Sequence, residues 1–394
     1  MMMRISTSMV KRKYWIWSRF RWMTLACLAV GFAVATLSGS QTVHADNRDV
    51  PALPEWQAPE LRDHPLAGKI WSRAKGDFVA PQEYGTALAR SRFVLLGEVH
   101  DNPDHHRLQA WAINTISKLR GARLVEGAPQ MDVIAMEMLT SDQLVLLDRF
   151  YSRNARVPRS RTAEDFGRIV KWDKLGWPDY KIYEPIIAAA IDGHLVVTPA
   201  SPPRAENRKI STEGLGALPD GEAGRLALDR PLPEALAEDL AAEIEESHCG
   251  MLPKQAVPNM SLVQRLRDAR MADALMVSEW KGAALIAGNG HVRRDRGVPW
   301  YLAQRNITDN SIAVVRHIEV EEGKTAPKDY DLVGGAATAL ADFVVFTPRQ
   351  PRPEPCEEMK RQMEAIKAQR NSPAKPPEAP PAGDGKAEAG RRSP

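Results

Sequence analysis

The chain has 394 residues, of which 43% are hydrophobic and 26% are charged, an ordinary balance for a globular protein. This length suits one large domain or two small ones, and a net charge of +3 does not argue for a nucleic-acid partner. Much of the excess positive charge also lies in the two ends of the chain, which we do not expect to fold with the core.

The N-terminus has the pattern of a secretory signal peptide over residues 1–45. A basic region precedes an apolar run at 23–37, which is too short to span a membrane comfortably, and a small-x-small site ends at Ala45. We therefore expect cleavage after Ala45 and a mature chain that is periplasmic or secreted. The alternatives are an uncleaved membrane anchor and a lipoprotein acylated at Cys27, which is not favoured because the residues before Cys27 fit an acylation box poorly.

The C-terminal segment 348–394 is rich in proline and charge and reads as a disordered tail. Within it, 354–370 could form a short exposed helix. Cys249 and Cys356 remain after signal cleavage into an oxidising space, but a disulfide between them is not favoured because Cys356 lies in this tail. No spacing of cysteine and histidine indicates a structural zinc site.

Apolar runs that alternate with helical patterns predict an α/β fold, a mainly parallel sheet with helices on both faces. We expect an extended strap at 46–67 and a folded domain at 68–347, with a helical subdomain at about 201–262. The expected strands are a hairpin at 68–71 and 77–79, then 93–96, 133–136, 195–197, 283–287, 311–318 and 341–346. The expected helices are 81–90, 104–120, one capped by Ser141, 184–191, 233–246 and 259–280.

A dense group of titratable residues follows the first core strand, 93–96. Gly97 breaks this strand and Pro103 is placed to begin a helix, which makes a strand-to-helix turn, where α/β sheets place their chemistry. The group comprises Glu98, His100, Asp101, Asp104, His105 and His106. Imidazole and carboxylate groups gathered there could bind a metal or move protons, and the alternative is a polar turn with solvated charges.

Two further strand ends carry polar residues, Glu137 and His291. Because parallel strands end at one edge of a sheet, we expect both residues to converge with Glu98 and His100. These four residues are the candidate catalytic group, and Glu98, His100 and His291 are the candidate ligands of a divalent metal. The alternatives are a salt-bridged strand end for Glu137 and a hydrogen-bonded loop histidine for His291. Glycines beside these residues, Gly97, Gly288 and Gly290, should let the backbone turn sharply.

The chain resembles the ChaN-like haem-binding, iron-regulated proteins, within the wider superfamily of Tiki-type peptidases and erythromycin esterases. The resemblance covers about 68–346 and rests on six strings that occur in this order: LLGEVHDNPDHHRLQ, VIAMEML, YEPIIAAA, SHCGMLP, VQRLRDARMADAL and AGNGHVRRDRGVP. It implies an α/β domain with a smaller helical domain, noncovalent haem, and a role in haem or iron acquisition at the cell envelope. It also makes Glu98, His100, Glu137 and His291 the polar site of the superfamily. The chain departs from the family at 201–204, where Ser-Pro-Pro-Arg replaces an asparagine before Pro-Arg.

Haem needs an axial ligand, an apolar slot and cations for its propionates. Tyrosine is one known axial ligand, and Tyr180 and Tyr183 lie in an aromatic stretch with Trp172 and Trp177, which could stack on a porphyrin or simply pack the core. The candidate propionate partners are Arg204, Arg293 and Arg294. No CxxCH motif is present, which excludes covalent c-type attachment.

Three hypotheses therefore compete: an exported haem-binding protein, a metal-dependent peptidase or esterase, and an envelope interaction module. The first of these is the prediction. The partners that we expect with it are haem, a second copy of the chain and an envelope haem-transport protein, without nucleic acid. A Soret band on addition of hemin separates the first hypothesis from the other two.

Overall fold

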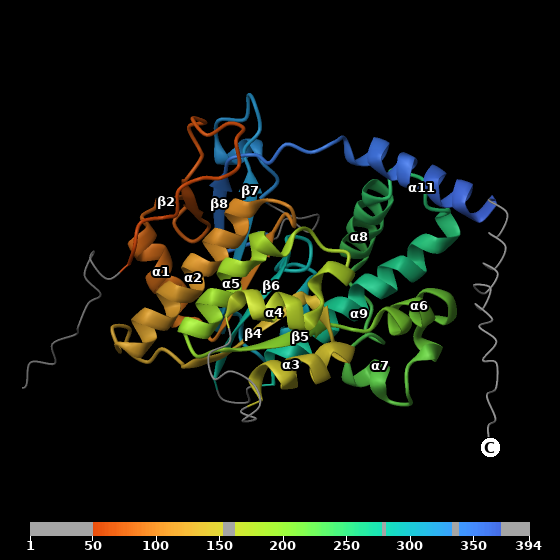
Figure 1. The fold of residues 1–394 in the computed structure, drawn as a ribbon, viewed down its shortest axis with the longest axis horizontal. Coiled ribbons are helices and arrows are strands. Elements are labelled where there is room, and N and C mark those ends of the chain that lie inside the picture. The colour runs from red at the N-terminus through yellow and green to blue at the C-terminus, as the bar shows by residue number, and fades with distance from the viewer. Residues whose placement is uncertain (1–49, 153–161, 278–280, 333–338, 372–394) are drawn as a thin grey trace, which may run out of the picture. The chain divides into compact units, whose positions relative to one another are not determined.

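Figure 1 shows a computed structural model of the chain, which describes residues 50–152, 162–277, 281–332 and 339–371. The predicted signal peptide and the last part of the predicted tail, 372–394, lie outside these residues. Within the described residues, no helix is both long and apolar enough to cross a membrane.

The centre of the fold is an eight-stranded, mainly parallel sheet with the strand order β2-β1-β8-β7-β3-β6-β4-β5. The pairs β3–β6, β3–β7, β4–β5, β4–β6 and β7–β8 are parallel, and β1 pairs antiparallel with β2 and β8. This confirms the predicted fold class and the predicted hairpin. The strands are β1 (Ile70–Ser72), β2 (Asp77–Val79), β3 (Phe93–Glu98), β4 (Met131–Thr140), β5 (Val196–Ser201), β6 (Gly282–Gly288), β7 (Ile312–Glu319) and β8 (Phe343–Thr347).

Helices cover both faces of the sheet. Val94 and Leu96 of β3 pack in one core with α1, α2 and α5, which lie together over one face (Figure 1). Phe93 and Leu95, which alternate with them, pack in a second core with α9 and α10 on the other face. The helices are α1 (Pro81–Arg90), α2 (Pro103–Gly121), α3 (Leu144–Tyr151), α4 (Ala163–Val170), α5 (Tyr180–Asp192), α6 (Arg204–Glu213), α7 (Glu222–Arg225), α8 (Glu234–Ser247), α9 (Val257–Leu275), α10 (Val298–Ala303) and α11 (Pro355–Asn371).

Two local predictions differ from the structure around β4. This strand continues to Thr140, yet its pairing with β6 ends at Met136, so Glu137 is the first residue beyond the regular ladder. The predicted cap at Ser141 is wrong by one residue. Thr140 is the N-cap of a short 3₁₀ turn that precedes α3, and the backbone N–H of Thr140 donates a hydrogen bond to Gln143 Oε1.

The connection between β5 and β6 is helical, as predicted, but it packs on the sheet instead of forming a separate unit. Leu266 and Met271 of α9 belong to the same core as the strands. The adjoining α8 packs on this layer through a small cluster of its own that includes Leu236, Leu240 and Val257. Helix α9 therefore brings its side chains directly to the carboxyl ends of β4 and β6.

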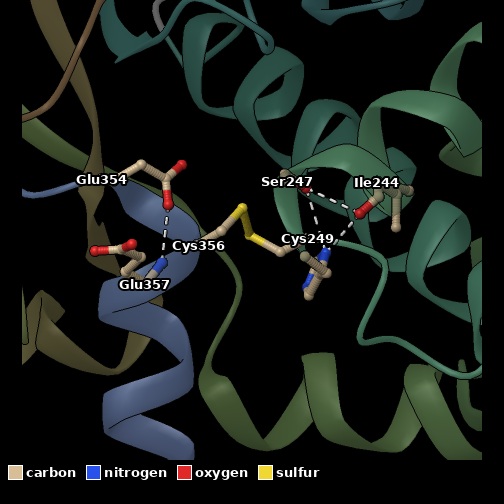
Figure 2. Close-up of a disulfide and its surroundings, with 7 residues drawn as sticks. Ile244, Ser247, Cys249, Glu354, Cys356 and Glu357 are labelled. Carbon is tan, nitrogen blue, oxygen red and sulfur yellow. Dashed lines mark hydrogen bonds between the residues drawn. A yellow bond between two sulfur atoms is a disulfide. The ribbon is translucent and has the colours of Figure 1, made fainter.

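The first part of the C-terminal segment lies against the domain. Arg349 forms a β-bridge with Glu60, and Arg352 forms ion pairs with Asp101 and Glu319. The predicted exposed helix is present as α11. Because this segment is held in place, Cys356 can meet Cys249, and the structure contains the disulfide bond that the sequence analysis did not favour. Figure 2 shows this bond joining the start of α11 to the turn after α8.

Candidate functional site

Glu98, at the end of β3, lies at the centre of a buried hydrogen-bond network. Its side chain is 0% exposed. Oε1 accepts a hydrogen bond from His100 Nδ1 at 2.8 Å, and Oε2 accepts one from Gln109 Nε2 at 2.8 Å. His106 Nδ1 lies 3.2 Å from Oε2, and its Nε2 donates to the His100 carbonyl at 3.0 Å. The first two turns of α2 therefore fix both the carboxylate and the loop that carries His100.

Tyr183 belongs to this same network, not to a separate haem site. It is fully buried, and its hydroxyl donates to Glu98 Oε1 at 3.2 Å and to the His100 carbonyl at 3.1 Å. Burial and the Glu98 carboxylate raise the pKa of Tyr183 well above its usual value. This placement argues against the predicted role of Tyr183 as an axial phenolate, because burial keeps the phenol neutral and away from solvent.

Glu137 holds a second network on the neighbouring strand. Its Oε2 accepts a hydrogen bond from the backbone N–H of Gly288 at 2.7 Å, and its Oε1 is paired with Arg267 of α9. His291 Nε2 lies 3.3 Å from the same Oε1, while His291 Nδ1 bonds Asp268 Oδ1 at 2.5 Å. His291 is thus held between two carboxylates, and its side chain is only 6% exposed.

The two networks meet at His100. His100 Nε2 lies 4.0 Å from Glu137 Oε1, the oxygen that His291 also approaches. The structure therefore brings Glu98, His100, Glu137 and His291 to one edge of the sheet, as the strand ends predict. The glycines were predicted to let the backbone turn sharply, but here they provide space. A Cβ atom added to Gly97 would lie 2.3 Å from Asn289, and one added to Gly288 would lie 3.1 Å from His100 Nε2. Both glycines therefore make room for side chains and neither has a positive φ.

The charges at this edge favour anionic glutamates and protonated histidines. Burial acts to raise the pKa of Glu137, but the cations around it, led by His291 and Arg267, hold it well below its usual value. Burial acts to lower the pKa of His100, but the carboxylates of Glu137 and Glu98 raise it to about 9. The pKa of His291 is raised despite its burial, mainly by Glu137 and Asp268. At neutral pH His100 is therefore an imidazolium ion, and the glutamates are weak bases.

The predicted metal site is not supported. Among the described residues, no group of three histidine, cysteine, aspartate or glutamate side chains could hold a metal ion. The physical reason is that the expected donors already have partners. Both ring nitrogens of His291 face carboxylates, and Arg267 supplies the positive charge at Glu137 that a metal ion would supply.

A cleft of about 640 Å³ opens beside Glu137. Met138, Trp177 and Val263 give it an apolar wall, and its cations are Lys174, Arg204 and Arg267. His100 lies next to this wall, because its ring centroid is 4.8 Å from that of Trp177 in an edge-on contact. The side chain of His100 is 35% exposed, and its Nε2 has no hydrogen-bond partner within the described residues and is not among the buried atoms.

The remaining haem candidates separate into two groups. Arg204 is exposed and lines the cleft, so it stays a candidate propionate partner. Arg293 is 6% exposed and forms ion pairs with Asp239, Glu243 and Asp295, which argues against its predicted role as a propionate partner.

The other aromatic and cationic candidates are engaged inside the fold. Arg294 is likewise paired, with Asp342 and Asp309. Tyr180 donates its hydroxyl to the Ala163 carbonyl, and burial raises its pKa. This hydrogen bond argues against its predicted role as an axial phenolate as well. Trp172 is buried in the core, as the structural alternative predicted, whereas Trp177 faces the cleft.

Sequence reasoning missed the contribution of α9. Arg267 and Asp268 complete the charge balance around Glu137 and His291, and Gln264 Nε2 lies 3.0 Å from His291 Nδ1. The signal that could have found them is spacing, because 264, 267 and 268 are three and four positions apart and share one helix face. Polar residues on one face of a helix that also carries core residues indicate a polar site beneath it.

Comparisons with known proteins found one family match and several similar solved structures. The family described as haem-binding uptake, Tiki superfamily, ChaN matches residues 86–302. Among solved structures, ChaN of Campylobacter jejuni, described with cofacial haem binding, has a TM-score of 0.53 at 21% identity, covering 70% of this chain and 95% of its own. The type III effector HopBA1 (10% identity) and an erythromycin esterase EreC mutant in its open conformation (11% identity) both have TM-scores of 0.35. They cover 76% and 77% of this chain, and 99% and 100% of their own chains. No curated protein matches significantly.

The fold resemblance to C. jejuni ChaN confirms the α/β architecture, and the family match spans more than half of the 394 residues, including β3 to β6 and the whole polar edge. The chain therefore belongs to the ChaN-like haem-binding uptake family of the Tiki superfamily.

Proposed function

We propose that this protein binds haem noncovalently in the cleft beside Glu137, with His100 as the iron ligand. The observation that carries the proposal is the open Nε2 of His100, next to a cleft that lies wholly inside the family match. Imidazole is a common axial ligand of haem iron. Glu98 fixes the orientation of this ring beside Trp177, because it holds Nδ1 of the same ring at 2.8 Å.

The cleft suits the remaining parts of a porphyrin. Its volume of about 640 Å³ falls in the range of small-molecule sites, roughly 300–1,000 Å³. Trp177 and Met138 offer an apolar and polarisable surface to a flat macrocycle. Arg204 and Lys174, both exposed at the cleft, supply cations for the propionates. The bound haem would supply the iron chemistry, and these residues would bind and orient it.

We further propose that the mature protein works outside the cytoplasm, in haem or iron acquisition at the envelope. The signal pattern at 1–45 supports export, and the Cys249–Cys356 disulfide is typical of an oxidising compartment. ChaN of C. jejuni is described with cofacial haem binding. A homodimer joined through haem is therefore the loaded state that we propose. N-terminal sequencing of exported protein tests the first point, and light scattering with and without hemin tests the second.

Acid–base hydrolysis is the alternative for the same edge, because His291 lies between Asp268 and Glu137 and could relay a proton. The pKa values of the side chains at this edge argue against acid–base hydrolysis. A general base needs a pKa near the operating pH, and the pKa values of Glu98 and Glu137 are lowered whereas that of His100 is raised to about 9. Haem binding requires only that iron displace a proton from His100.

Hemin titration of the mature protein tests the proposal. Wild type should give a saturable Soret shift with one haem per chain, and His100→Asn should lose the axial-ligand signature. The matched control is His194→Asn, which changes an exposed histidine at the opposite end of β5. Equal spectra for the two variants would exclude His100 as the ligand. No Soret shift with wild type would remove the haem proposal and make ester or peptide hydrolysis by the same edge the first hypothesis.

A further inference from the structure

Three neighbouring strands, β1, β8 and β7, place one row of side chains on the half of the sheet that ends at β2, outside the haem cleft. Trp71 of β1 pairs in register with Val344 of β8, and Val344 pairs in register with Arg316 of β7. Residues that are directly paired on adjacent strands present their side chains on the same face. An indole, an isopropyl group and a guanidinium therefore lie side by side on this face.

This row forms part of the wall of a cavity of about 700 Å³. Tyr330, Leu332 and Leu340, from the connection between β7 and β8, add further apolar surface. The volume lies in the range of small-molecule sites, about 300–1,000 Å³, which are mostly apolar with a few polar groups that orient the ligand. Arg316 is placed to be such a group.

The guanidinium of Arg316 has no direct ion pair among the described residues, although the carboxylates of Asp331, Glu243 and Asp295 act on it from farther away. Its Nη1 donates to the backbone carbonyl of Asp331 at 3.1 Å, and its Nε is buried without a hydrogen-bond partner. It forms no ion pair with a carboxylate of the described chain, and the undescribed part of this connection, 333–338, reads VGGAAT and contains no acid. The other carboxylate in the wall, Asp342, already pairs with Arg73 and Arg294.

This arrangement leaves a positive charge undercompensated. Burial, with the positive charge of Arg293 in addition, lowers the pKa of Arg316, and the carboxylates of Asp331, Glu243 and Asp295 offset this only in part. A buried donor without a partner is unfavourable, and in a native structure it commonly marks the place of a water or an ion. A carboxylate is the anion that matches a guanidinium fork in geometry. The apolar wall requires the rest of the ligand to be hydrophobic.

We propose that this cavity is a second ligand site, which takes an amphipathic monocarboxylate, such as a fatty or aromatic acid, with the carboxylate on Arg316. The apolar body of the ligand packs on Trp71 and Val344. The site is independent of haem binding by position: its wall comes from 71–73 and 316–344, outside the family match at 86–302, whereas the haem cleft is built from 137–267, inside it.

The test uses dansylaminoundecanoic acid as the fluorescent probe and its methyl ester as the uncharged control. The acid should bind wild type saturably, and Arg316→Met, which keeps an apolar stem, should weaken it about ten- to hundredfold because a charged hydrogen bond is lost. Arg316→Lys should restore part of the affinity, since it returns the charge without the fork. Arg168→Met is the control, because Arg168 is 74% exposed on α4. The hemin titration of Arg316→Met should match that of wild type.

Each of the contrary results would overturn the proposal. Absence of saturable binding, equal binding of acid and ester, or unchanged affinity in Arg316→Met would show that the cavity does not recognise carboxylates. Loss of hemin binding in Arg316→Met would show that the cavity is part of the haem site. If Arg316→Met fails to fold by circular dichroism, the comparison of acid with ester on wild type decides the question.

Discussion

Tyr183 Oη lies 3.2 Å from Glu98 Oε1 and donates a hydrogen bond to it. This contact joins α5 to the end of β3 and makes a residue that resembles a haem ligand into a support for the polar edge. The ring of Tyr183 also packs at a tilt against that of His106, with centroids 4.0 Å apart. Tyr183 therefore positions the groups that hold His100, and it has no open atom for iron.

Tyr183→Phe should lower stability and leave the iron ligand unchanged. The substitution removes one donor from a buried carboxylate, which costs about 1–3 kcal/mol. Urea unfolding of the haem-free protein measures this loss, and the Soret maximum of the loaded variant should stay at the wild-type position. A shifted Soret maximum with unchanged stability would instead restore tyrosine as the ligand.

The sheet and its polar edge were predictable from the sequence because apolar runs mark strands and because parallel strands end at one edge. Glu98, His100, Glu137 and His291 follow such runs, so their convergence needs no knowledge of helix rotation. The direction of Tyr183 could not be predicted in this way. Its orientation depends on how α5 rotates against α2 in the core, and the aromatic stretch around it fits a buried or an open face equally well.

The same limit explains the other differences from the structure. Arg293 follows a strand as His291 does, but its direction toward Asp239 and Glu243 is set by the packing of α8, which the strand pattern does not contain. The disulfide was missed because the composition of 348–394 indicates disorder. The interactions that hold its first part, such as the ion pair of Arg352 with Glu319, join residues far apart in sequence.

Hemin affinity should rise with pH, because iron needs the neutral imidazole of His100. The pKa of His100 is raised to about 9, so affinity should increase about tenfold per pH unit from neutral pH and level off above that value. Titration of hemin at several pH values measures the slope. The variant His100→Asn lacks the imidazole, so its hemin affinity should show only the pH dependence of haem itself. Equal pH dependence in the variant and wild type would contradict the assignment of His100 as the iron ligand.

The stability of the haem-free protein should change in the opposite direction. A histidine whose folded pKa is raised stabilises the fold fully below its unfolded value, about 6.5, and this contribution is lost as pH rises through the folded value. For His100 this stabilising contribution is lost as the pH rises to the folded pKa of about 9. The difference in unfolding free energy between wild type and His100→Asn should therefore shrink between neutral pH and that value, as denaturant curves can show.

Arg267→Met should destabilise the fold more than the loss of a surface ion pair would. Glu137 is 2% exposed and Arg267 is 24% exposed in their ion pair, so the substitution leaves a buried carboxylate with less compensation, at a cost of about 3 kcal/mol. The same variant should raise the pKa of Glu137. Arg168→Met, which breaks an ion pair on α4 with 74% exposure of the arginine, should change stability by less than about 1 kcal/mol. Equal effects of the two variants would mean that Arg267 is not needed for charge balance.

The disulfide between Cys249 and Cys356 should hold α11 to the turn after α8. The bond closes a loop with a sequence separation of 107, and removing a native disulfide of this kind costs about 2–5 kcal/mol. Cys249→Ser should therefore lower the unfolding midpoint and make α11 the first segment that a protease cuts. The ion pairs of Arg352 lie before α11, so the sheet should remain folded in this variant. Alkylation of the mature wild type without reductant gives the direct check: two reactive thiols under oxidising conditions would show that the bond does not form.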